Sequence, residues 1–411
     1  MSELPEGVSL PSVGSPVIRP SASVMLSREA KGGHEILLGH RVSELPSFPD
    51  FWSFPGGGVS DVDKEVSKDH PDWLMVDEKY RTATFALLRE MAEEVGLSPD
   101  GKGGIVSIDE DTREGVCADK GGWRKSVESG NVSIENFHCE MITDRTTPPF
   151  APMGFQNFFF HVPTGLPGVI PTFPPGRTEF DEFRWWKPQD LLSAWEGNLL
   201  RIPPPIVTLL RDIVERIGDE GDLQTACDDL SADPPSGDHR IEFAPGVEVI
   251  PLETDTLPPS THTNCYIIGE PGGEVVIVDP AAKSEESLNY LKAKISEAMS
   301  PDSRIVASIF THRHPDHIGD LARISEIYQA PIWASEETLG AISTDIGVSK
   351  LEEGDTIELN GPSGVSTWEV IETPGHCPGH ICLVGEAGVV SGDNCVVVGT
   401  ILVPSSDGDM D

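Results

Sequence analysis

The sequence predicts a protein of two α/β domains, and three observations lead to this prediction. Its 411 residues exceed what one ordinary hydrophobic core accommodates. Strand-like and helix-like segments alternate in both halves of the chain. Between the halves, residues 217–240 are polar, acidic and interrupted by Gly and Pro, which is typical of a linker. We therefore expect domains at residues 1–216 and 241–411, joined by this acidic linker.

The first half begins with two short alternating segments that predict strands, separated by a polar hairpin. A Gly-rich turn, FPGGGVSD, follows. The strongest helix signal covers residues 80–97, where Leu87, Leu88, Met91 and Val95 share one face, and we expect the opposite face to stay acidic. Two helices close this half, and the second starts with prolines suited to a first helical turn. The expected strands are 21–26, 35–41, 155–162 and 183–186, and the closing helices are 187–195 and 203–217.

The second half restarts with strand signals and contains one clear helix. The apolar run RIVASIF, residues 304–310, predicts a buried strand. Strand and helix signals then alternate to the end. The expected strands before this run are 247–252, 263–269 and 274–280, the helix is 285–298, and the later segments are 331–335, 356–360, 367–372, 380–385 and 388–392.

The composition is strongly acidic, with 68 Asp and Glu against 29 Lys and Arg and a formal net charge of -39 spread along the chain. Such a surface repels nucleic acid at long range, although a local groove holding metals could override the average field. It also suggests adaptation to a salty environment. The N-terminus has no leader pattern and no apolar run reaches spanning length, so we expect a cytoplasmic protein without a membrane partner. Seven scattered cysteines fit reduced thiols.

The stretch THRHPDHIGD, residues 311–320, places four metal-ligand side chains directly after the expected buried strand. Along an extended turn, His312 and His314 point the same way. At the entry to the next helix, Asp316 and His317 can face a second position. Imidazole is the commonest protein ligand for zinc, so this one motif can serve two metals.

Two later segments complete the pattern. TPGHCPGH contributes His376 and SGDN contributes Asp393, each where a strand gives way to a loop. A lone histidine is more often a satisfied core or loop residue, but the combination predicts a metal site. The pattern resembles the metallo-β-lactamase superfamily. That resemblance implies an αββα sandwich and hydrolysis of thioesters, phosphoesters, lactams or nucleic acid.

The resemblance also assigns roles to the residues. It implies up to two Zn²⁺ ions, a bridging hydroxide as the nucleophile, and a catalytic as well as a ligand role for Asp316. Asp279 is similar to the carboxylate that orients a ligand histidine, and His380 to a neighbour of the substrate, although each is equally expected as a structural residue. The implied ligands are His312, His314 and His376 for one zinc and Asp316 and His317 for the other, with Asp393 bridging them.

Within the superfamily, TLPPSTHTNCYIIG and TPGHCPGHICL resemble glyoxalase II relatives and a mitochondrial single-strand endoribonuclease, over residues 245–411. Members normally continue past the bridging aspartate to a late histidine of the second metal position, whereas no histidine follows His380 here. We expect the sequence to be a fragment, with a weakly held second metal completed by water as the alternative. A truncated sandwich is expected to expose an apolar edge.

The helix over residues 80–97 carries Glu90, Glu93 and Glu94 at positions i, i+3 and i+4. This spacing stacks three carboxylates on one face, where they repel one another unless a cation neutralises them. Carboxylate oxygens suit Mg²⁺ or Mn²⁺, which also hold the phosphates of a substrate. An ordinary solvated acidic face is equally expected in a chain this acidic.

The Gly-rich turn upstream favours the metal site, because Gly56, Gly57 and Gly58 allow the backbone to approach a phosphate closely. Turn and helix together resemble the Nudix box, Gx5Ex7REUxEExGU, of metal-dependent pyrophosphohydrolases, which implies an α/β/α sandwich. In the left half, the first acidic position falls on Asp63 and an insertion follows it. The right half matches fully at Arg89, Glu90, Glu93, Glu94, Gly96 and Leu97.

The insertion, with RPSASVML before it and RWWKPQDLLSAWEGNLLRIPPP after it, is similar to the peroxisomal coenzyme A diphosphatase branch, over residues 15–216. The resemblance implies that Glu90, Glu93 and Glu94 bind the metals and that Arg89 steadies them. A metal-activated water would then attack one phosphorus of a diphosphate. Glu182 is a further candidate carboxylate, but a solvated strand-end residue is the favoured interpretation.

The sequence thus predicts a bifunctional metal-dependent hydrolase that acts on small phosphorylated substrates. Acyl-coenzyme A would connect the two sites, since one could cut its diphosphate and the other its thioester. Two alternatives stay open for the C-terminal half: a single-strand endoribonuclease, or a non-catalytic binding or scaffold module.

Overall fold

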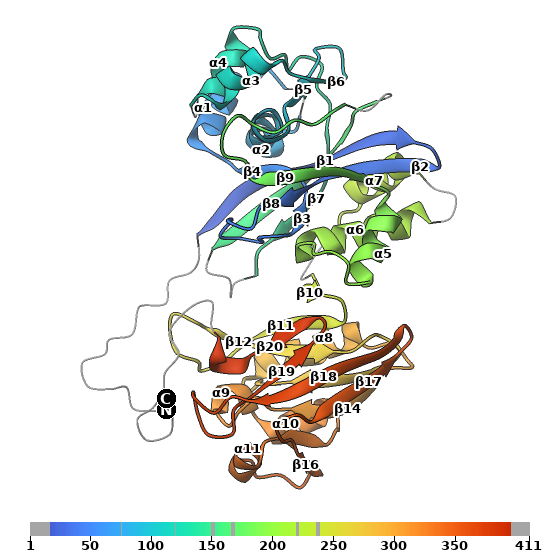
Figure 1. Cartoon of the computed structure of the whole chain (residues 1–411). Helices are drawn as coiled ribbons and strands as arrows, with labels where there is room; N and C mark the ends of the chain where they lie inside the picture. The colour runs from blue at the N-terminus through green and yellow to red at the C-terminus, as the bar shows by residue number, and fades with distance from the viewer. Residues whose placement is uncertain are drawn as a thin grey trace, which may run out of the picture. The chain divides into compact units, whose positions relative to one another are not determined.

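A computed structural model describes residues 17–395, apart from 75, 120, 149–152, 166–168, 219–221 and 236–238 (Figure 1). The chain divides into two units after His239. Among the described residues, no helix is both long and apolar enough to cross a membrane. The seven cysteines, all described, form no disulfide, as expected from their scattered positions.

The first unit contains a seven-stranded mixed sheet in the order β3-β2-β1-β8-β7, with β4 paired to β1 and β9 paired to β2. The long central strand β1 runs parallel to β8 and antiparallel to β2. A separate pair is formed by β5 and β6. The strands are β1 Ile18–Ala30, β2 Gly33–Arg41, β3 Trp52–Ser53, β4 Gly56–Gly58, β5 Leu97–Pro99, β6 Ile105–Ser107, β7 Glu140–Thr146, β8 Gly154–Pro163 and β9 Phe180–Trp186.

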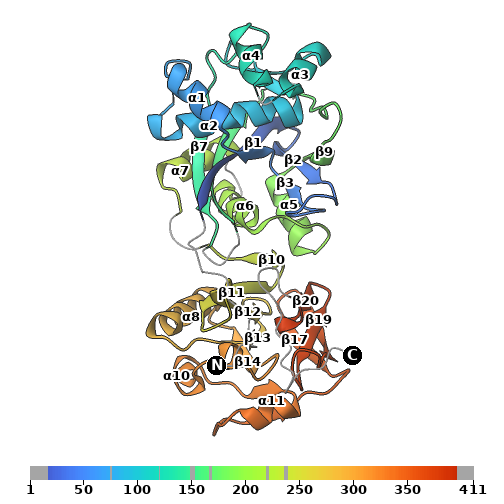
Figure 2. The same ribbon diagram turned by 90° about the vertical axis from the view of Figure 1, so that its left-hand side faces the viewer.

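Helices cover both faces of this sheet (Figures 1 and 2). Side chains alternate along β1, so that Val24 and Leu26 enter one core while Met25 enters the core on the opposite face. The predicted α/β/α sandwich is therefore confirmed. The first core is covered by α1 Asp61–Asp69, α2 Glu78–Glu90, α3 Glu110–Cys117 and α4 Gly122–Glu128, and the second by α5 Pro188–Glu196, α6 Pro204–Ile217 and α7 Leu223–Ala232.

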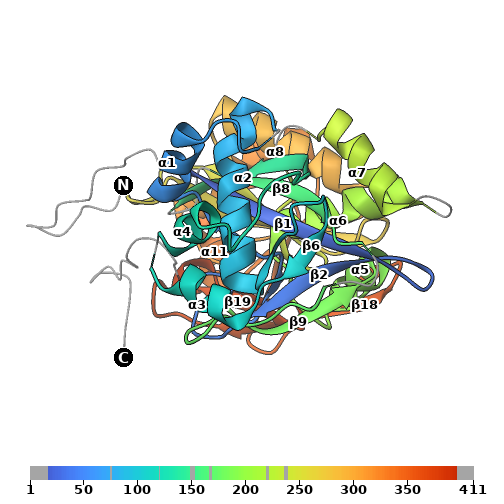
Figure 3. The ribbon, with the colours of Figure 1, turned by 90° about the horizontal axis from the view of Figure 1, so that it is seen from above.

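The helix α2 crosses over β1 and continues into a π-helical turn, η1, over Met91–Val95 (Figure 3). The sequence predicted one regular helix over residues 80–97. The turn ends at Gly96, which adopts the left-handed conformation at φ 70° and donates its backbone N–H to the carbonyl of Met91. Such single π-turns occur frequently at functional sites.

The acidic segment 217–240 is not only a linker, because α7 forms within it. Leu223, Cys227 and Leu230 lie at helical spacing and are buried in the second core of the first unit. The linker prediction rested on the average composition of the segment, which does not reveal an apolar stripe among acidic residues. Residues 223–232 therefore belong to the first unit.

The second unit contains two sheets packed face to face. The larger has the order β10-β11-β12-β13-β14-β15-β16 and the smaller the order β17-β18-β19-β20. The strands are β10 Glu242–Ala244, β11 Val247–Glu253, β12 His262–Ile268, β13 Glu274–Val278, β14 Arg304–Ile309, β15 Ile332–Ala334, β16 Val348–Lys350, β17 Thr356–Gly361, β18 Gly364–Glu372, β19 Ile381–Gly385 and β20 Gly388–Val390.

The alternation of side chains along β13 again separates two cores. Val276 and Val278 face the smaller sheet, whereas Val275 and Ile277 face the helix α8, Glu285–Ala298. This gives the α–β–β layers of the predicted sandwich. On the smaller sheet, two apolar side chains stay largely exposed: Val365 in β18 is 58% exposed and Val389 in β20 is 60% exposed. Three short helices complete the unit: α9 Pro315–Ile318, α10 Leu321–Ile327 and α11 Glu336–Ala341.

Candidate functional site

The second unit gathers histidines from two distant segments at the ends of its strands. His312 and His314 follow β14, and His376 lies in the loop after β18. The Nδ1 atom of His314 is 3.0 Å from His312 Nε2 and 2.9 Å from His376 Nε2. Two ligands of a tetrahedral zinc lie roughly 3.3 Å apart, so each of these two pairs of nitrogens already has nearly the spacing that the ion requires.

Asp393 brings a carboxylate to the same place from the short helix that follows β20, Gly392–Asn394. Its Oδ2 atom is 3.5 Å from His376 Nε2 and 3.9 Å from His312 Nε2. One ligand atom from each of these residues and from His314 can be chosen so that all four lie within 4.8 Å of one another. Imidazoles with a carboxylate are a donor set that suits Zn²⁺.

Asp279 lies behind this group and fixes two of the segments that build it. It directly follows β13 and has a left-handed backbone at φ 47°. Its carboxylate accepts hydrogen bonds from the backbone N–H of Thr311 at 2.8 Å and from the Thr311 hydroxyl at 2.6 Å. The same carboxylate lies 2.9 Å from His317 Nδ1. The predicted orienting role of Asp279 thus has a geometric basis, and Thr311 is a partner that the sequence did not reveal.

His317 connects Asp279 to Asp393, since its Nε2 atom is 3.1 Å from Asp393 Oδ1. Burial alone would lower the pKa of His317, but Asp279 and Asp393 raise it well above its usual value. His317, in turn, lowers the pKa of Asp393 to about 2 against the effect of burial. Asp316 is the neighbouring residue in α9 and is half-buried. A second metal held by Asp316 and His317 stays a prediction.

Two of the candidate ligand histidines, His312 and His314, are electrically different from His317. Burial, and then the neighbouring imidazoles, lower the pKa of His312 well below its usual value. Burial also lowers the pKa of His314. Both are therefore neutral at pH 7 and have the lone pairs that a metal needs.

In the first unit, Arg89 is the centre of a buried cluster of carboxylates. Its Nε and Nη2 atoms contact the two carboxylate oxygens of Asp63 at 2.9 and 3.1 Å. Its Nη1 atom lies 2.8 Å from Glu90 Oε1 and 2.9 Å from Glu93 Oε2. The Nη2 atom also donates to the carbonyl of Gly58. The pairing of the predicted Asp63 with Arg89 is a bidentate contact, the strongest geometry available to these groups.

The Gly-rich turn contacts the other glutamates of this cluster. The backbone N–H of Gly56 donates to Glu94 Oε2 at 2.7 Å. A Cβ atom at Gly57 would lie 2.2 Å from Glu90 Oε1, so a larger residue there would displace this carboxylate. The described contacts of the turn are thus to Glu90, Glu94 and Arg89, and phosphate binding by Gly56, Gly57 and Gly58 stays a prediction.

The alternative of an ordinary solvated acidic face does not describe these glutamates. Glu94 is only 9% exposed, and the side chains of Glu90 and Glu93 are 13% and 26% exposed, because the Gly-rich turn and α1 cover them. Burial raises the pKa of Glu90 to about 7, and it raises the pKa of Glu93 as well. The pKa of Glu94 is raised well above its usual value by burial and by Glu90.

The charge of the cluster fits a divalent cation. With Asp63 there are four carboxylates, and Arg89 is the cation that contacts three of them. The unbalanced negative charge and the hard oxygen donors suit Mg²⁺ or Mn²⁺. Glu182 lies elsewhere, about half-exposed in β9, and pairs with Arg184 at 2.6 Å, as expected for a solvated strand residue.

Comparison with known proteins identifies one of the two units. Residues 258–405 match the family model described as the Metallo-beta-lactamase superfamily. The C-terminal unit is a metallo-β-lactamase domain. Its recognition from the histidine pattern is therefore confirmed.

Curated relatives match this metallo-β-lactamase domain. An uncharacterized protein of Aquifex aeolicus (strain VF5) is 30% identical over 139 residues, which are 30% of this chain and 60% of that protein. A hydroxyacylglutathione hydrolase of Pectobacterium carotovorum subsp. carotovorum (strain PC1) is 29% identical over 145 residues, 35% of this chain and 51% of the relative. The chain thus spans about half the length of the curated relatives it matches.

Solved structures are similar to each unit separately. A NUDIX hydrolase from Alicyclobacillus acidocaldarius covers 53% of this chain and 99% of its own, with 21% identity and a TM-score of 0.45. A metallo-beta-lactamase family protein from Thermus thermophilus covers 38% of this chain and 62% of its own, with 20% identity and a TM-score of 0.31. The function of the first unit must therefore be argued from its own residues.

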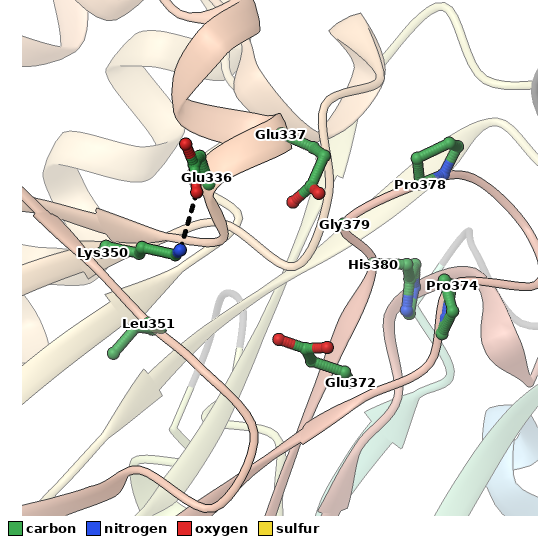
Figure 4. A pocket seen from close by; sticks show the side chains of 9 residues that line it. All are labelled: Glu336, Glu337, Lys350, Leu351, Glu372, Pro374, Pro378, Gly379 and His380. Carbon is green, nitrogen blue, oxygen red and sulfur yellow. Dashed lines mark hydrogen bonds and ion pairs between the residues drawn. The ribbon is translucent and has the colours of Figure 1, made fainter.

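A hollow of about 190 Å³ lies beside the loop that carries His376 in the metallo-β-lactamase domain. Figure 4 shows the carboxylates of Glu337 and Glu372 facing this space, while Glu336 pairs with Lys350. His380 also lines the hollow, but its side chain is fully buried. The ring contacts Thr373 Oγ1 through Nδ1 at 2.8 Å and accepts the backbone N–H of Asp393 through Nε2 at 3.2 Å. These contacts position Asp393 and leave no ring nitrogen for a substrate.

Proposed function

We propose that the chain is a hydrolase with two metal-dependent sites, one in each unit. The first unit would hydrolyse the diphosphate of a nucleoside-diphosphate-linked substrate with Mg²⁺ or Mn²⁺. The observation that carries this proposal is the buried cluster in which Arg89 holds Asp63, Glu90 and Glu93. Excess carboxylates buried around one arginine are costly in a merely structural role.

The residues of this cluster have separate tasks in the proposed reaction. Arg89 fixes Glu90 and Glu93 relative to α1 through its contact with Asp63. The N–H of Gly56 fixes one oxygen of Glu94. A divalent metal bound there supplies a Lewis acid for the phosphate oxygens and an acidified water. Because the carboxylates are held before substrate arrives, little reorganisation is needed during reaction.

The metallo-β-lactamase domain would hydrolyse a thioester with Zn²⁺ bound to His312, His314, His376 and Asp393. The converging ring nitrogens support the metal, and the relatives named hydroxyacylglutathione hydrolases support a thioester rather than another ester. Asp279 holds the start of the ligand loop through Thr311. Zinc bound there would acidify a water at neutral pH.

Acyl-coenzyme A is the substrate that would use both sites. The test is incubation of the full chain with acetyl-coenzyme A, Mg²⁺ and Zn²⁺, with mass spectrometry for phosphopantetheine products and a thiol reagent for free thiol. Glu93→Gln with Glu94→Gln should remove only the diphosphate cleavage, and His312→Ala only the thiol release. Absence of both products from the wild-type protein would contradict an acyl-coenzyme A substrate.

A further inference from the structure

Arg113 is a second buried arginine near the glutamate cluster, and its position has no explanation in the Nudix resemblance. It lies in α3 and is only 4% exposed. Its Nη2 atom donates to the carbonyl of Glu93 at 2.8 Å and to the carbonyl of Thr172 at 3.2 Å. Its Nε and Nη1 atoms are buried without a hydrogen-bond partner among the described residues. Burying an arginine with unpartnered donors costs folding free energy, so the role of Arg113 must be sought in the contacts that it does make.

The contacts of Arg113 are part of how the end of the catalytic helix is closed. A helix leaves its last carbonyls without partners inside the helix. Here the carbonyl of Glu93 accepts from Arg113, that of Val95 from the N–H of Thr172 at 2.9 Å, and that of Gly96 from Ile108 at 3.0 Å. The π-turn that carries Glu93 and Glu94 is therefore held from outside, by α3 and by the segment around Thr172.

Gly96 provides the space for this arrangement. A Cβ atom there would lie 2.1 Å from Arg113 Nη1 and 2.3 Å from Thr172 Oγ1. The left-handed backbone at φ 70° also favours glycine. The glycine at this place in the motif thus admits a guanidinium against the end of the helix, where a cation also complements the negative end of the helix dipole.

We propose that Arg113 is a positioning residue for the metal-binding glutamates. It fixes the π-turn by joining the carbonyl of Glu93 to that of Thr172, and so fixes the direction in which Glu93 and Glu94 present their carboxylates. This inference rests on the proposed function of the first unit. It concerns the backbone of the turn, whereas Arg89 acts on the carboxylates themselves.

The chain offers a matched control for the test. Arg145 in β7 is equally buried, at 3% exposed, also has an unpartnered Nε atom, and pairs with Asp212 of α6 at 2.9 Å. The partner helix α6 covers the opposite face of the sheet from α2. Arg145→Met therefore removes a buried arginine of the same unit without touching the π-turn.

The experiment measures Mn²⁺ binding to the full chain by electron paramagnetic resonance, and diphosphate hydrolysis as a function of Mg²⁺. The signal lost in Glu93→Gln with Glu94→Gln defines the site. In Arg113→Met we expect Mn²⁺ affinity at this site to fall about tenfold and kcat to fall roughly a hundredfold with KM nearly unchanged, as for displaced supporting groups. Arg113→Lys, which can donate to one carbonyl, should recover part of both.

Arg145→Met should lower the melting temperature but keep Mn²⁺ affinity within about twofold of wild type, as expected for a site distant from the metal. Wild-type Mn²⁺ affinity in Arg113→Met, or an equal loss in Arg145→Met, would overturn the proposal. If the wild-type protein binds Mn²⁺ in an Arg113-dependent way but cleaves no diphosphate, the positioning role stands and the proposed reaction fails.

Discussion

Burial favours the neutral form of the side chains in both the glutamate cluster of the first unit and the histidine cluster of the second, but this form suits metal binding only in the second. Burial raises the pKa of Glu90 to about 7 in the first, and lowers the pKa of His312 in the second. The carboxylates thus resist being charged together, whereas His312 and His314 are already neutral. The glutamate cluster, called the oxygen site below, needs a cation to relieve the repulsion between its carboxylates. The histidine cluster, called the nitrogen site, can bind a metal as soon as the domain is folded.

The largest effect is expected from a variant that changes the oxygen site and leaves the nitrogen site intact. Glu93→Gln combined with Glu94→Gln removes two of the anionic ligands but keeps the shape of the side chains. We expect diphosphate hydrolysis to fall by about three orders of magnitude, because several kcal/mol of charge stabilisation is lost. Thermal unfolding should show an unchanged or higher melting temperature. Glu182→Gln is the control, and equal turnover in the double variant would refute the ligand assignment.

The next largest effect is expected from a variant that changes the nitrogen site and leaves the oxygen site intact. His312→Ala removes a proposed ligand of the cluster, whose Nε2 atom lies 3.0 Å from His314 Nδ1. We expect zinc affinity to fall more than about a hundredfold, which exceeds the usual cost of losing an outer-shell partner. Metal analysis after dialysis measures it, and thioester hydrolysis should be lost in parallel. Diphosphate hydrolysis should be unaffected; its loss would mean that the two sites are not separate.

A pH experiment sharpens the contrast between the sites. The folded pKa of Glu90, about 7, lies above the ordinary 4.5, so its stabilising contribution is complete below pH 4.5 and is lost as pH rises through 7. Between these values, metal-free wild-type protein should lose roughly 3 kcal/mol of unfolding free energy relative to Glu90→Gln. Urea unfolding with a chelator measures this difference. Addition of Mg²⁺ should restore the wild-type stability; parallel pH curves for the two proteins would contradict the prediction.

The smallest expected effect concerns the loop that carries His376. Gly379 has φ 75°, and a Cβ atom there would lie 2.6 Å from Glu337 Cβ. We expect Gly379→Ala to displace the loop and to weaken zinc binding about tenfold. Gly354→Ala is the matched control, since Gly354 has φ 81° but nothing within 4 Å of the added atom. If Gly379→Ala binds zinc as tightly as Gly354→Ala and the wild-type protein, the close contact at Gly379 does not position the loop.

The sequence predicted the two folds and the ligand groups because their signals are local. Periodicity placed the strand before His312 at β14, Arg304–Ile309, and the glutamates on one helix. The strand-end positions of His376 and Asp393 then put them at the same edge as His312. Residue type and spacing were sufficient for these features.

The missed features depend on contacts between distant segments. The bond from Thr311 to Asp279 and the contact of Arg113 with the carbonyl of Glu93 join elements that no periodic pattern relates. The covering of the glutamate face was also missed, because an amphipathic pattern marks the polar side of a helix but does not reveal what packs on it. The π-turn at Met91–Val95 has no composition signal of its own.

The position of α7 determines where the chain can be divided to express the two units separately. A first unit ended at residue 216, where the chain turns acidic, would lack Leu223, Cys227 and Leu230, which pack with α6 in the second core. Such a truncated product would expose the apolar surface that α7 covers, and it is expected to aggregate on expression. Cloning boundaries placed after Ala232 keep α7 with the first unit, so that the independent folding of each unit can be tested.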